Sequence, residues 1–186
     1  MIWKRIFGRS APDKDAAYLL YAQVVKQARS VEFYTRMGAP DTLEGRFELV
    51  TLHAFLLLHR LKNAGKQAKD LAQAVFDVLF DDMDQVLREL GVGDLSVGKK
   101  IKSMAELFYG RMNAYDAGMA ASDDALEQAI RRIVFAEMEP AEDQVKALAA
   151  YMRLAVSDLA RQPVEDILSG VLRFPAPLMA EAEGEA

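Results

Sequence analysis

Hydrophobic residues recur along most of this chain at the three- and four-residue spacing of amphipathic helices. Strand-like alternation is scarce, and Pro and Gly divide the periodic stretches into helix-sized segments joined by short connections. The predicted helices cover residues 12–29, 30–38, 42–64, 67–90, 96–115, 122–133, 140–159 and 163–170. Because short connections keep neighbouring helices together, the pattern predicts an all-α, single-domain helical bundle of about seven or eight helices.

The third predicted helix is apolar on nearly every side. A helix with this pattern is normally enclosed by others, so we expect it at the centre of the bundle. The 3.6-residue period also predicts which large side chains face inward. These include Tyr18, Leu43, Phe47, Leu90 and Phe108.

The two ends of the chain differ in composition from the helical part. Residues 1–10 combine large apolar residues with cations, so we predict weak membrane contact through Trp3, Lys4 and Arg5. The alternative is an ordinary start whose apolar residues fold onto the bundle. Residues 176–186 are small and acidic, which predicts a disordered tail and leaves residues 11–175 as the all-α domain.

Composition narrows the class of protein. The chain has 186 residues and no Cys, which excludes disulfides, thiolate zinc sites and a Cys nucleophile. Its net charge of −5 argues against a DNA-binding protein. No uninterrupted apolar run, residues 54–58 included, approaches the roughly 18 residues of a transmembrane helix. Without a secretory signal, we expect a cytoplasmic location, with peripheral contact at the inner face of the membrane.

Two segments imitate functional loops. Residues 93–100 match the phosphate-binding pattern G-x-x-x-x-G-K, but Lys100 stands where a Mg²⁺-binding Ser or Thr is required. The preceding residues also predict a helix instead of a buried strand, so we reject nucleotide hydrolysis. The acidic residues 81–84 lack the Gly and the distant Glu of a calcium loop.

A group of cations begins the fifth predicted helix. It contains Lys99, Lys100 and Lys102, and Arg111 follows further along the same helix. Two interpretations stay open: a solvated surface that complements the acidic residues 81–84, or a contact with an anionic partner such as ribosomal RNA.

The histidines give no metal site. His53 and His59 are six residues apart, so they point in different directions, whereas zinc pairs on a helix are three or four apart. Glu-x-x-His pairs are also absent, and we predict neither metal nor cofactor.

The third predicted helix nevertheless carries polar residues. Glu44 and Glu48 share a face, where we expect Arg46 and solvent beside them. The simpler interpretation of both histidines is a structural role. His53, however, lies on one helical stripe with Arg46 and Arg60, which marks a polar face that is a candidate functional surface.

Several short motifs follow one another in a defined order over about half of the chain. They are Gln27–Arg29, Phe33-Tyr34, Pro40–Thr42, Gly45–Glu48, Leu52-His53, Met83-Asp84, Leu87–Asp94, Val97–Lys99, Met104–Arg111 and Tyr115. In this order the motifs resemble the ubiquinol–cytochrome c chaperone family. Mitochondrial members carry a longer N-terminal region, and this sequence resembles a bacterial form without it.

The resemblance implies an assembly factor for the ubiquinol–cytochrome c oxidoreductase, without enzymatic activity. Family members bind newly made cytochrome b, an integral membrane protein, near the ribosome and the membrane, and some work with a small partner protein. The residues predicted to bind the client or a partner are Phe33, Tyr34, Asp41, Arg46, Glu48, His53, Arg88, Asp94, Lys99, Lys102, Tyr109, Arg111 and Tyr115.

The aromatic residues of these motifs divide into two groups. We expect Tyr34, Tyr109 and Tyr115 at the rim of a binding surface because their rings end in a polar group. We expect Phe47 and Phe108 in the core. The alternative for the charged motif residues is a polar network that holds the bundle in register.

Two other functions remain open. The first is an enzyme or ligand-binding protein, related to haem or quinone, that uses the face formed by Arg46, Glu48 and His53. An apolar cleft ending at that face would favour it, whereas a broad open groove would favour the chaperone. The second is a ribosome-docking adaptor that binds RNA through the lysine-rich side.

Overall fold

The computed structural model describes residues 14–177, and all regular secondary structure in this range is helical. The helices are α1 (Lys14–Ala28), α2 (Val31–Thr35), α3 (Leu43–Leu61), α4 (Lys66–Glu89), α5 (Asp94–Ala121), α6 (Asp123–Ile133), α7 (Glu142–Arg161) and α8 (Val164–Leu168). The all-α prediction is confirmed. The predicted membrane contact by Trp3, Lys4 and Arg5 and most of the predicted tail lie outside the described residues.

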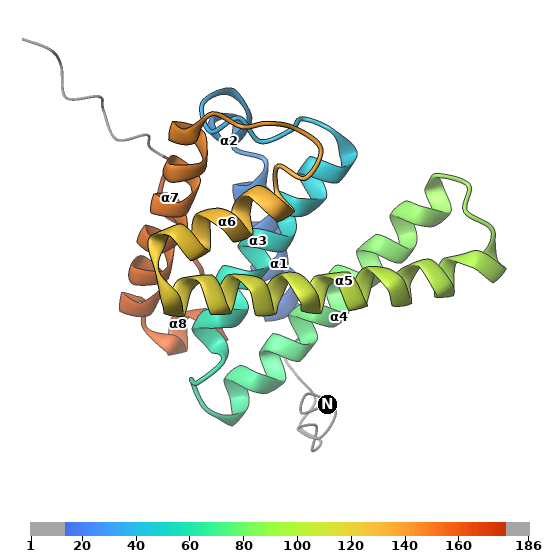
Figure 1. The fold of residues 1–186 in the computed structure, drawn as a ribbon. Helices are drawn as coiled ribbons and strands as arrows, with labels where there is room; N and C mark the ends of the chain where they lie inside the picture. The colour runs from blue at the N-terminus through green and yellow to red at the C-terminus, as the bar shows by residue number, and fades with distance from the viewer. Residues whose placement is uncertain (1–13, 178–186) are drawn as a thin grey trace, which may run out of the picture.

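Helix α3 occupies the centre of the molecule, as its pattern predicts. It packs against α1, α4, α5 and α7 (Figure 1). From Leu49 to Leu57 it is buried at nearly every position, because neighbouring helices cover it on several sides. The Thr42 hydroxyl accepts a hydrogen bond from the Gly45 amide at 3.1 Å and caps the first turn of α3.

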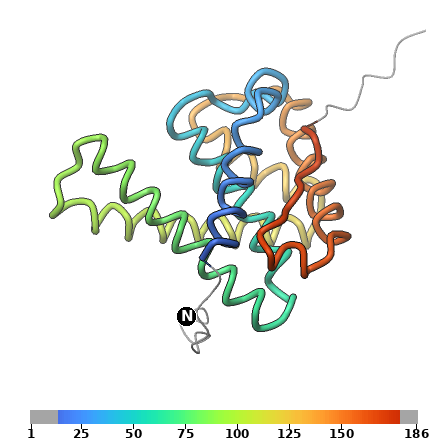
Figure 2. The backbone as a smooth tube through the Cα atoms, turned by 180° about the vertical axis from the view of Figure 1, so that it is seen from behind, coloured from blue at the N-terminus to red at the C-terminus, as the bar shows by residue number. Residues whose placement is uncertain are grey.

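Helices α4 and α5 continue beyond the rest of the molecule as an antiparallel pair (Figures 1 and 2). We call residues 81–105, which include the turn between these helices, the arm, and the remaining helical part the body. Gly91 ends α4 with a φ of 81°, a left-handed conformation that glycine adopts without strain. The amides of Gly91 and Val92 donate to the carbonyls of Arg88 and Leu87, which completes a Schellman motif.

Helix α5 is longer than the sequence predicts, since it ends at Ala121 and not at Tyr115. Its last residues contain several alanines and no proline, so nothing interrupts the helix before Ser122. Gly118 is tolerated there because α6 packs directly against it. A Cβ at this position would lie 2.9 Å from the Cα of Leu126.

Some predicted inner positions are wrong. Tyr18 and Leu43 are 55% and 60% exposed, since the buried stripe of α1 runs through Leu20 and Val24 and Leu43 begins its helix at the surface. Leu90 is 61% exposed because it lies at the end of the arm, where no further helix covers it. Phe47, which we expected in the core, is half-buried, whereas Phe108 is buried as predicted.

Candidate functional site

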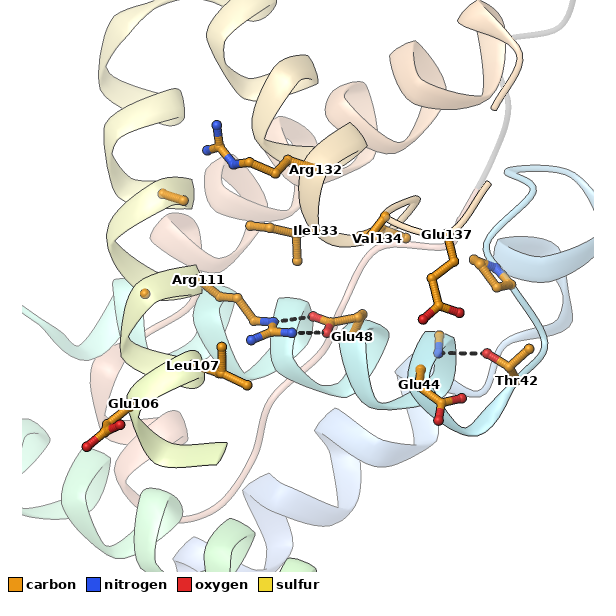
Figure 3. Close-up of a pocket in the computed structure, with 15 residues that line it drawn as sticks. Thr42, Glu44, Glu48, Glu106, Leu107, Arg111, Arg132, Ile133, Val134 and Glu137 are labelled. Carbon is orange, nitrogen blue, oxygen red and sulfur yellow. Dashed lines mark hydrogen bonds and ion pairs between the residues drawn. The ribbon is translucent and has the colours of Figure 1, made fainter. Parts of the chain in front are cut away.

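An open groove of about 540 Å³ lies between the start of α3, the middle of α5, and the end of α6 with the segment that follows it (Figure 3). We call it the α3–α5 groove. It is lined by Pro40, Thr42, Glu44, Gly45, Glu48, Glu106, Leu107, Gly110, Arg111, Ala114, Arg132, Ile133, Val134, Ala136 and Glu137.

A close backbone approach shapes one end of this groove. A Cβ on Gly45 would lie 2.0 Å from the carbonyl oxygen of Pro40, a distance that real Cβ atoms do not adopt. Only glycine therefore allows the segment before α3 to fold back onto its first turn. This contact fixes Pro40 and Thr42 at the rim.

An ion pair joins the two helices that form the groove. Arg111 on α5 donates to both carboxylate oxygens of Glu48 on α3, with Nε 2.5 Å from Oε2 (Figure 3). The two side chains are only 18% and 10% exposed. The guanidinium carbon of Arg111 also lies 5.9 Å from the ring centre of Phe47. Our expectation that Glu48 meets Arg46 and solvent is therefore wrong.

Burial dominates the electrostatics of this pair. It raises the pKa of Glu48, while the hydrogen bonds and the positive charge of Arg111 act in the opposite direction. The bidentate geometry is the strong form of an arginine–carboxylate contact. Glu48 therefore joins α3 to α5 and is not a free carboxylate.

The walls of the groove are apolar and its edge is acidic. Leu107, which is 54% exposed, lies on one side of the ion pair and Ile133 on the other in the view of Figure 3. Gly110 leaves the α5 wall open, because nothing lies within 4 Å of a Cβ added there. The charged residues around the groove besides the ion pair are Glu44, Glu106, Glu137 and Arg132.

Three predicted site residues are buried in the body. Phe33, His53 and Tyr115 are each 0% exposed, so a partner has no access to them in this structure. The prediction that Tyr115 lies at a rim is wrong. Its ring packs 5.3 Å from that of Phe55, and burial raises the pKa of its hydroxyl.

His53 is a hydrogen-bonded core residue. Its Nδ1 lies 2.7 Å from the carbonyl oxygen of Leu49, and its Nε2 lies 2.9 Å from the hydroxyl of Tyr151. Its ring meets Phe33 edge-on at 5.0 Å. Burial lowers the pKa of His53 to about 4, which keeps the imidazole neutral near pH 7.

The predicted polar face of α3 is therefore not one surface. His53 faces the core, and Glu48 pairs with α5. Arg46 is 61% exposed and binds Asp41 at 2.7 Å. Arg60 donates to the carbonyl oxygens of Leu159 and Gln162, at the end of α7. Arg46, Glu48 and His53 do not converge on a cleft, so the geometry expected of the enzyme alternative is absent.

The predicted tyrosines at the surface have different surroundings. Tyr34 is half-buried and donates to the carbonyl oxygen of Ala28 at 2.8 Å. Tyr109 is 38% exposed and stacks on Phe76 with ring centres 5.4 Å apart. It lines a second hollow, between α3, α4 and α5, and not the α3–α5 groove.

The remaining predicted residues lie on the arm. Arg88 binds Asp84 at 2.5 Å and also binds Asp94, so it connects α4 to α5 at the surface. Lys99 and Lys102 are exposed. Arg111 is held in the groove by Glu48, so the four cations of the fifth predicted helix do not form one basic surface.

The sequence analysis missed most of the groove. Leu107, Gly110, Ile133, Val134 and Glu137 were not among the predicted site residues. Two of them could have been recognised from the sequence pattern. Leu107 is a large apolar residue outside the inward-facing stripe of its helix, and Gly110 lies inside a helix without ending it. Such positions are typical of a surface to which something else comes close.

Residues 14–177 contain neither a metal-binding cluster nor a membrane-spanning helix. Nowhere in this range do three or more His, Asp or Glu side chains gather closely enough to hold a metal ion. Every helix there is also too short or too polar to cross a bilayer.

Comparison with known sequences gives a consistent picture. Residues 35–174 match the family described as ubiquinol-cytochrome C chaperone. The chain is 28% identical over 162 residues to ubiquinol-cytochrome c reductase complex assembly factor 1 of Mus musculus, covering 87% of this chain and 55% of the mouse protein. It is 27% identical over 155 residues to the Xenopus laevis assembly factor, covering 83% of this chain and 78% of the frog protein. It thus spans only about half the length of the mouse relative.

A solved structure has the same fold. The crystal structure of the Cbp3 homolog from Brucella abortus superimposes with a TM-score of 0.80 and 34% sequence identity. The superposition covers 89% of this chain and 92% of that one. The similarity therefore includes nearly all of the described residues.

Proposed function

This chain belongs to the ubiquinol–cytochrome c chaperone family, and from this premise we propose that it binds newly synthesised cytochrome b while the ubiquinol–cytochrome c oxidoreductase is assembled. The names of its relatives support a role in assembly of this complex, because they are assembly factors of it. Residues 11–175 would form the chaperone domain. A cytoplasmic location, contact with the ribosome and a small partner protein stay predictions.

We assign the client to the α3–α5 groove. The observation that carries this assignment is an open, largely apolar groove with a buried ion pair between its walls. Cytochrome b is an integral membrane protein, so its unassembled segments expose apolar side chains that need cover. Leu107, Ile133 and Val134 supply apolar surface for such a segment.

The acidic charge at the edge of the groove favours client segments that carry a positive charge. Membrane-spanning segments commonly end in Lys or Arg. Glu44, Glu106 and Glu137 carry the opposite charge at the groove, where a flanking cation of the client would lie. We therefore propose an apolar segment with a basic end as the client.

This function requires binding and no catalysis. The residues that line the groove include no histidine, and its most buried carboxylate, Glu48, is engaged by Arg111. A groove of this kind holds a guest by shape and charge. Enzymatic chemistry has no support in this arrangement.

The test fills the groove without breaking the fold. In a host depleted of the native protein, Gly110→Trp should fail to restore cytochrome b, because the indole occupies the groove. Gly110→Ala, at the same site, and Ala150→Trp, on the exposed face of α7, are the controls. Each variant is first checked for helicity and for its urea midpoint.

Two measurements are made on every strain: the haem absorbance of cytochrome b, and its cross-linking to a photoreactive residue placed at Leu107. Failure of Gly110→Trp alone supports the proposal. Full restoration by Gly110→Trp, or cross-linking equal to that of Ala150→Trp, would exclude the groove. Normal cytochrome b in the depleted host would refute the function itself.

A further inference from the structure

The end of the arm exposes two leucines. Leu95 is 101% exposed and Leu90 is 61% exposed, on either side of the turn between α4 and α5. The end of the arm is also the part of these two helices most distant from the body (Figures 1 and 2). An exposed pair of large apolar residues at a protruding end is typical of a contact site.

Lysines continue this surface along α5. Leu95, Lys99 and Lys102 are four and three residues apart, so they share one outward face of the helix, and Lys100 is adjacent. Val97, Ile101 and Met104 lie on other positions and are buried or partly buried. We call Leu90, Leu95, Lys99, Lys100 and Lys102 the arm tip.

Charge at the arm tip favours an anionic partner. Arg88 pairs with both Asp84 and Asp94, so its single positive charge offsets one of their two negative charges. Glu89 accepts a hydrogen bond from Gln85. Among the described residues, the three lysines have no ion-pair partner. Glu106, the next residue on the same face, ends the basic stripe.

We propose that the arm tip docks on an anionic membrane surface, with Leu90 and Leu95 among the headgroups and the lysines at the lipid phosphates. A bilayer uses both features, since apolar burial and attraction to anionic lipid add together. RNA would use the lysines alone and would leave a fully exposed leucine without a role.

The shape of the molecule fits this orientation. The chain carries a net charge of −5, so an anionic surface repels it as a whole, whereas the lysines of the arm tip are attracted. That repulsion is screened beyond a Debye length of about 8 Å at physiological salt, so a projecting arm reduces it. Two leucines and three lysines give a weak and reversible contact.

The test measures co-sedimentation of the full chain with two kinds of vesicle. One kind contains phosphatidylcholine alone, and the other an equal mixture of phosphatidylcholine and phosphatidylglycerol. The wild-type protein should bind the mixed vesicles only, and more weakly as salt rises. The double variant Leu90→Ser/Leu95→Ser should lower the membrane partition about tenfold. The triple change Lys99→Gln/Lys100→Gln/Lys102→Gln should lower it about tenfold or more.

Matched changes on the body serve as controls. Val31→Ser/Leu154→Ser removes two exposed apolar residues, and Lys66→Gln/Lys69→Gln/Lys146→Gln removes three exposed lysines. Both controls should retain wild-type binding. Equal loss in the body and arm variants would overturn the proposal, because the contact would then depend on overall charge or hydrophobicity.

Other outcomes also decide the question. Binding that responds to the lysines but not to the leucines, together with binding to ribosomal RNA, would assign the arm tip to RNA. Loss with Trp3→Ser/Lys4→Gln/Arg5→Gln, but not with the arm variants, would assign membrane contact to the N-terminal segment. Gly110→Trp should bind vesicles normally, so failure of the client groove and failure of this proposal are distinguishable.

Discussion

The body and the arm both contain an arginine that binds a carboxylate on another helix or turn, but the two contacts differ in their exposure to water. In the body, Arg111 and Glu48 are 18% and 10% exposed. On the arm, Arg88 is 49% exposed, and its partners Asp84 and Asp94 are 37% and 86% exposed. The same residue types therefore have different consequences. The buried pair of Arg111 and Glu48 is needed for the stability of the fold, because neither charge can be left without its partner. Water can solvate the charges of Arg88 and its partners, so these contacts contribute little to stability.

The largest effect is expected from breaking the buried pair. Arg111→Met should lower the free energy of unfolding by about 3 kcal/mol, because Glu48 would remain buried without a partner. Urea unfolding followed by circular dichroism measures the change. Replacing both partners, as in Glu48→Leu/Arg111→Met, should recover most of the loss, because no buried charge is left. If the double variant is as unstable as the single one, the pair is not what joins α3 to α5.

A pH dependence tests the other buried polar residue of α3. The pKa of His53 is lowered from 6.5 to about 4, so below pH 6.5 the unfolded chain binds a proton that the folded chain does not. The free energy of unfolding should therefore fall between pH 6.5 and pH 4, by about 3 kcal/mol in total, and it should be fully retained above this window.

His53→Gln isolates this contribution from the carboxylates that titrate in the same window. The difference in unfolding free energy between wild type and variant should shrink as the pH falls from 6.5 to 4. A difference that stays constant would mean that His53 takes up its proton in the folded protein as readily as in the unfolded chain. His53 would then behave like an exposed group, as the charged residues of the arm do.

Two glycines that line the groove should respond in opposite ways to substitution by alanine. Gly45→Ala should destabilise the protein by about 2 kcal/mol, because its Cβ would collide with the carbonyl oxygen of Pro40. Gly110→Ala meets open space and should stabilise α5 by up to about 1 kcal/mol, since alanine favours the helix. Thermal unfolding measures both changes. Effects of the same sign would contradict the close approach at Gly45.

The helices themselves were predictable from the sequence. Their hydrophobic period predicted the number of segments and the central place of α3. The period did not predict the arm. It indicates which face of a helix is apolar, but not whether another helix covers that face. Leu90 lies on the same stripe as the buried Leu79, yet it is 61% exposed.

The candidate site was predictable only in part. Glu48 and Arg111 were both expected to matter, but they are 63 residues apart and their pairing depends on how α3 meets α5. His53 was a candidate because it lies on one helical stripe with Arg46 and Arg60. Its role is explained by Tyr151, 98 residues later, which a helical pattern cannot bring beside it. The far wall of the groove comes from the end of α6 and the segment after it, where no motif was recognised.

The smallest effect on stability is expected at Arg88, and it tests the arm directly. Arg88→Ala removes contacts to both Asp84 and Asp94, yet it should change the melting temperature by less than about 2 °C, because water solvates both carboxylates. Arg161→Ala, which breaks an exposed pair with Asp158 on the body, is the matched control. The two variants should melt alike.

They should differ at a membrane. Without Arg88, the charges of Asp84 and Asp94 are no longer offset beside the lysines, so binding to anionic vesicles should weaken in Arg88→Ala and stay unchanged in Arg161→Ala. A fall in melting temperature as large as that of Arg111→Met would mean that the exposed ion pairs of Arg88 are needed to hold α4 and α5 together in the arm. The contrast between body and arm would then not depend on burial, because an exposed pair would contribute as much as a buried one.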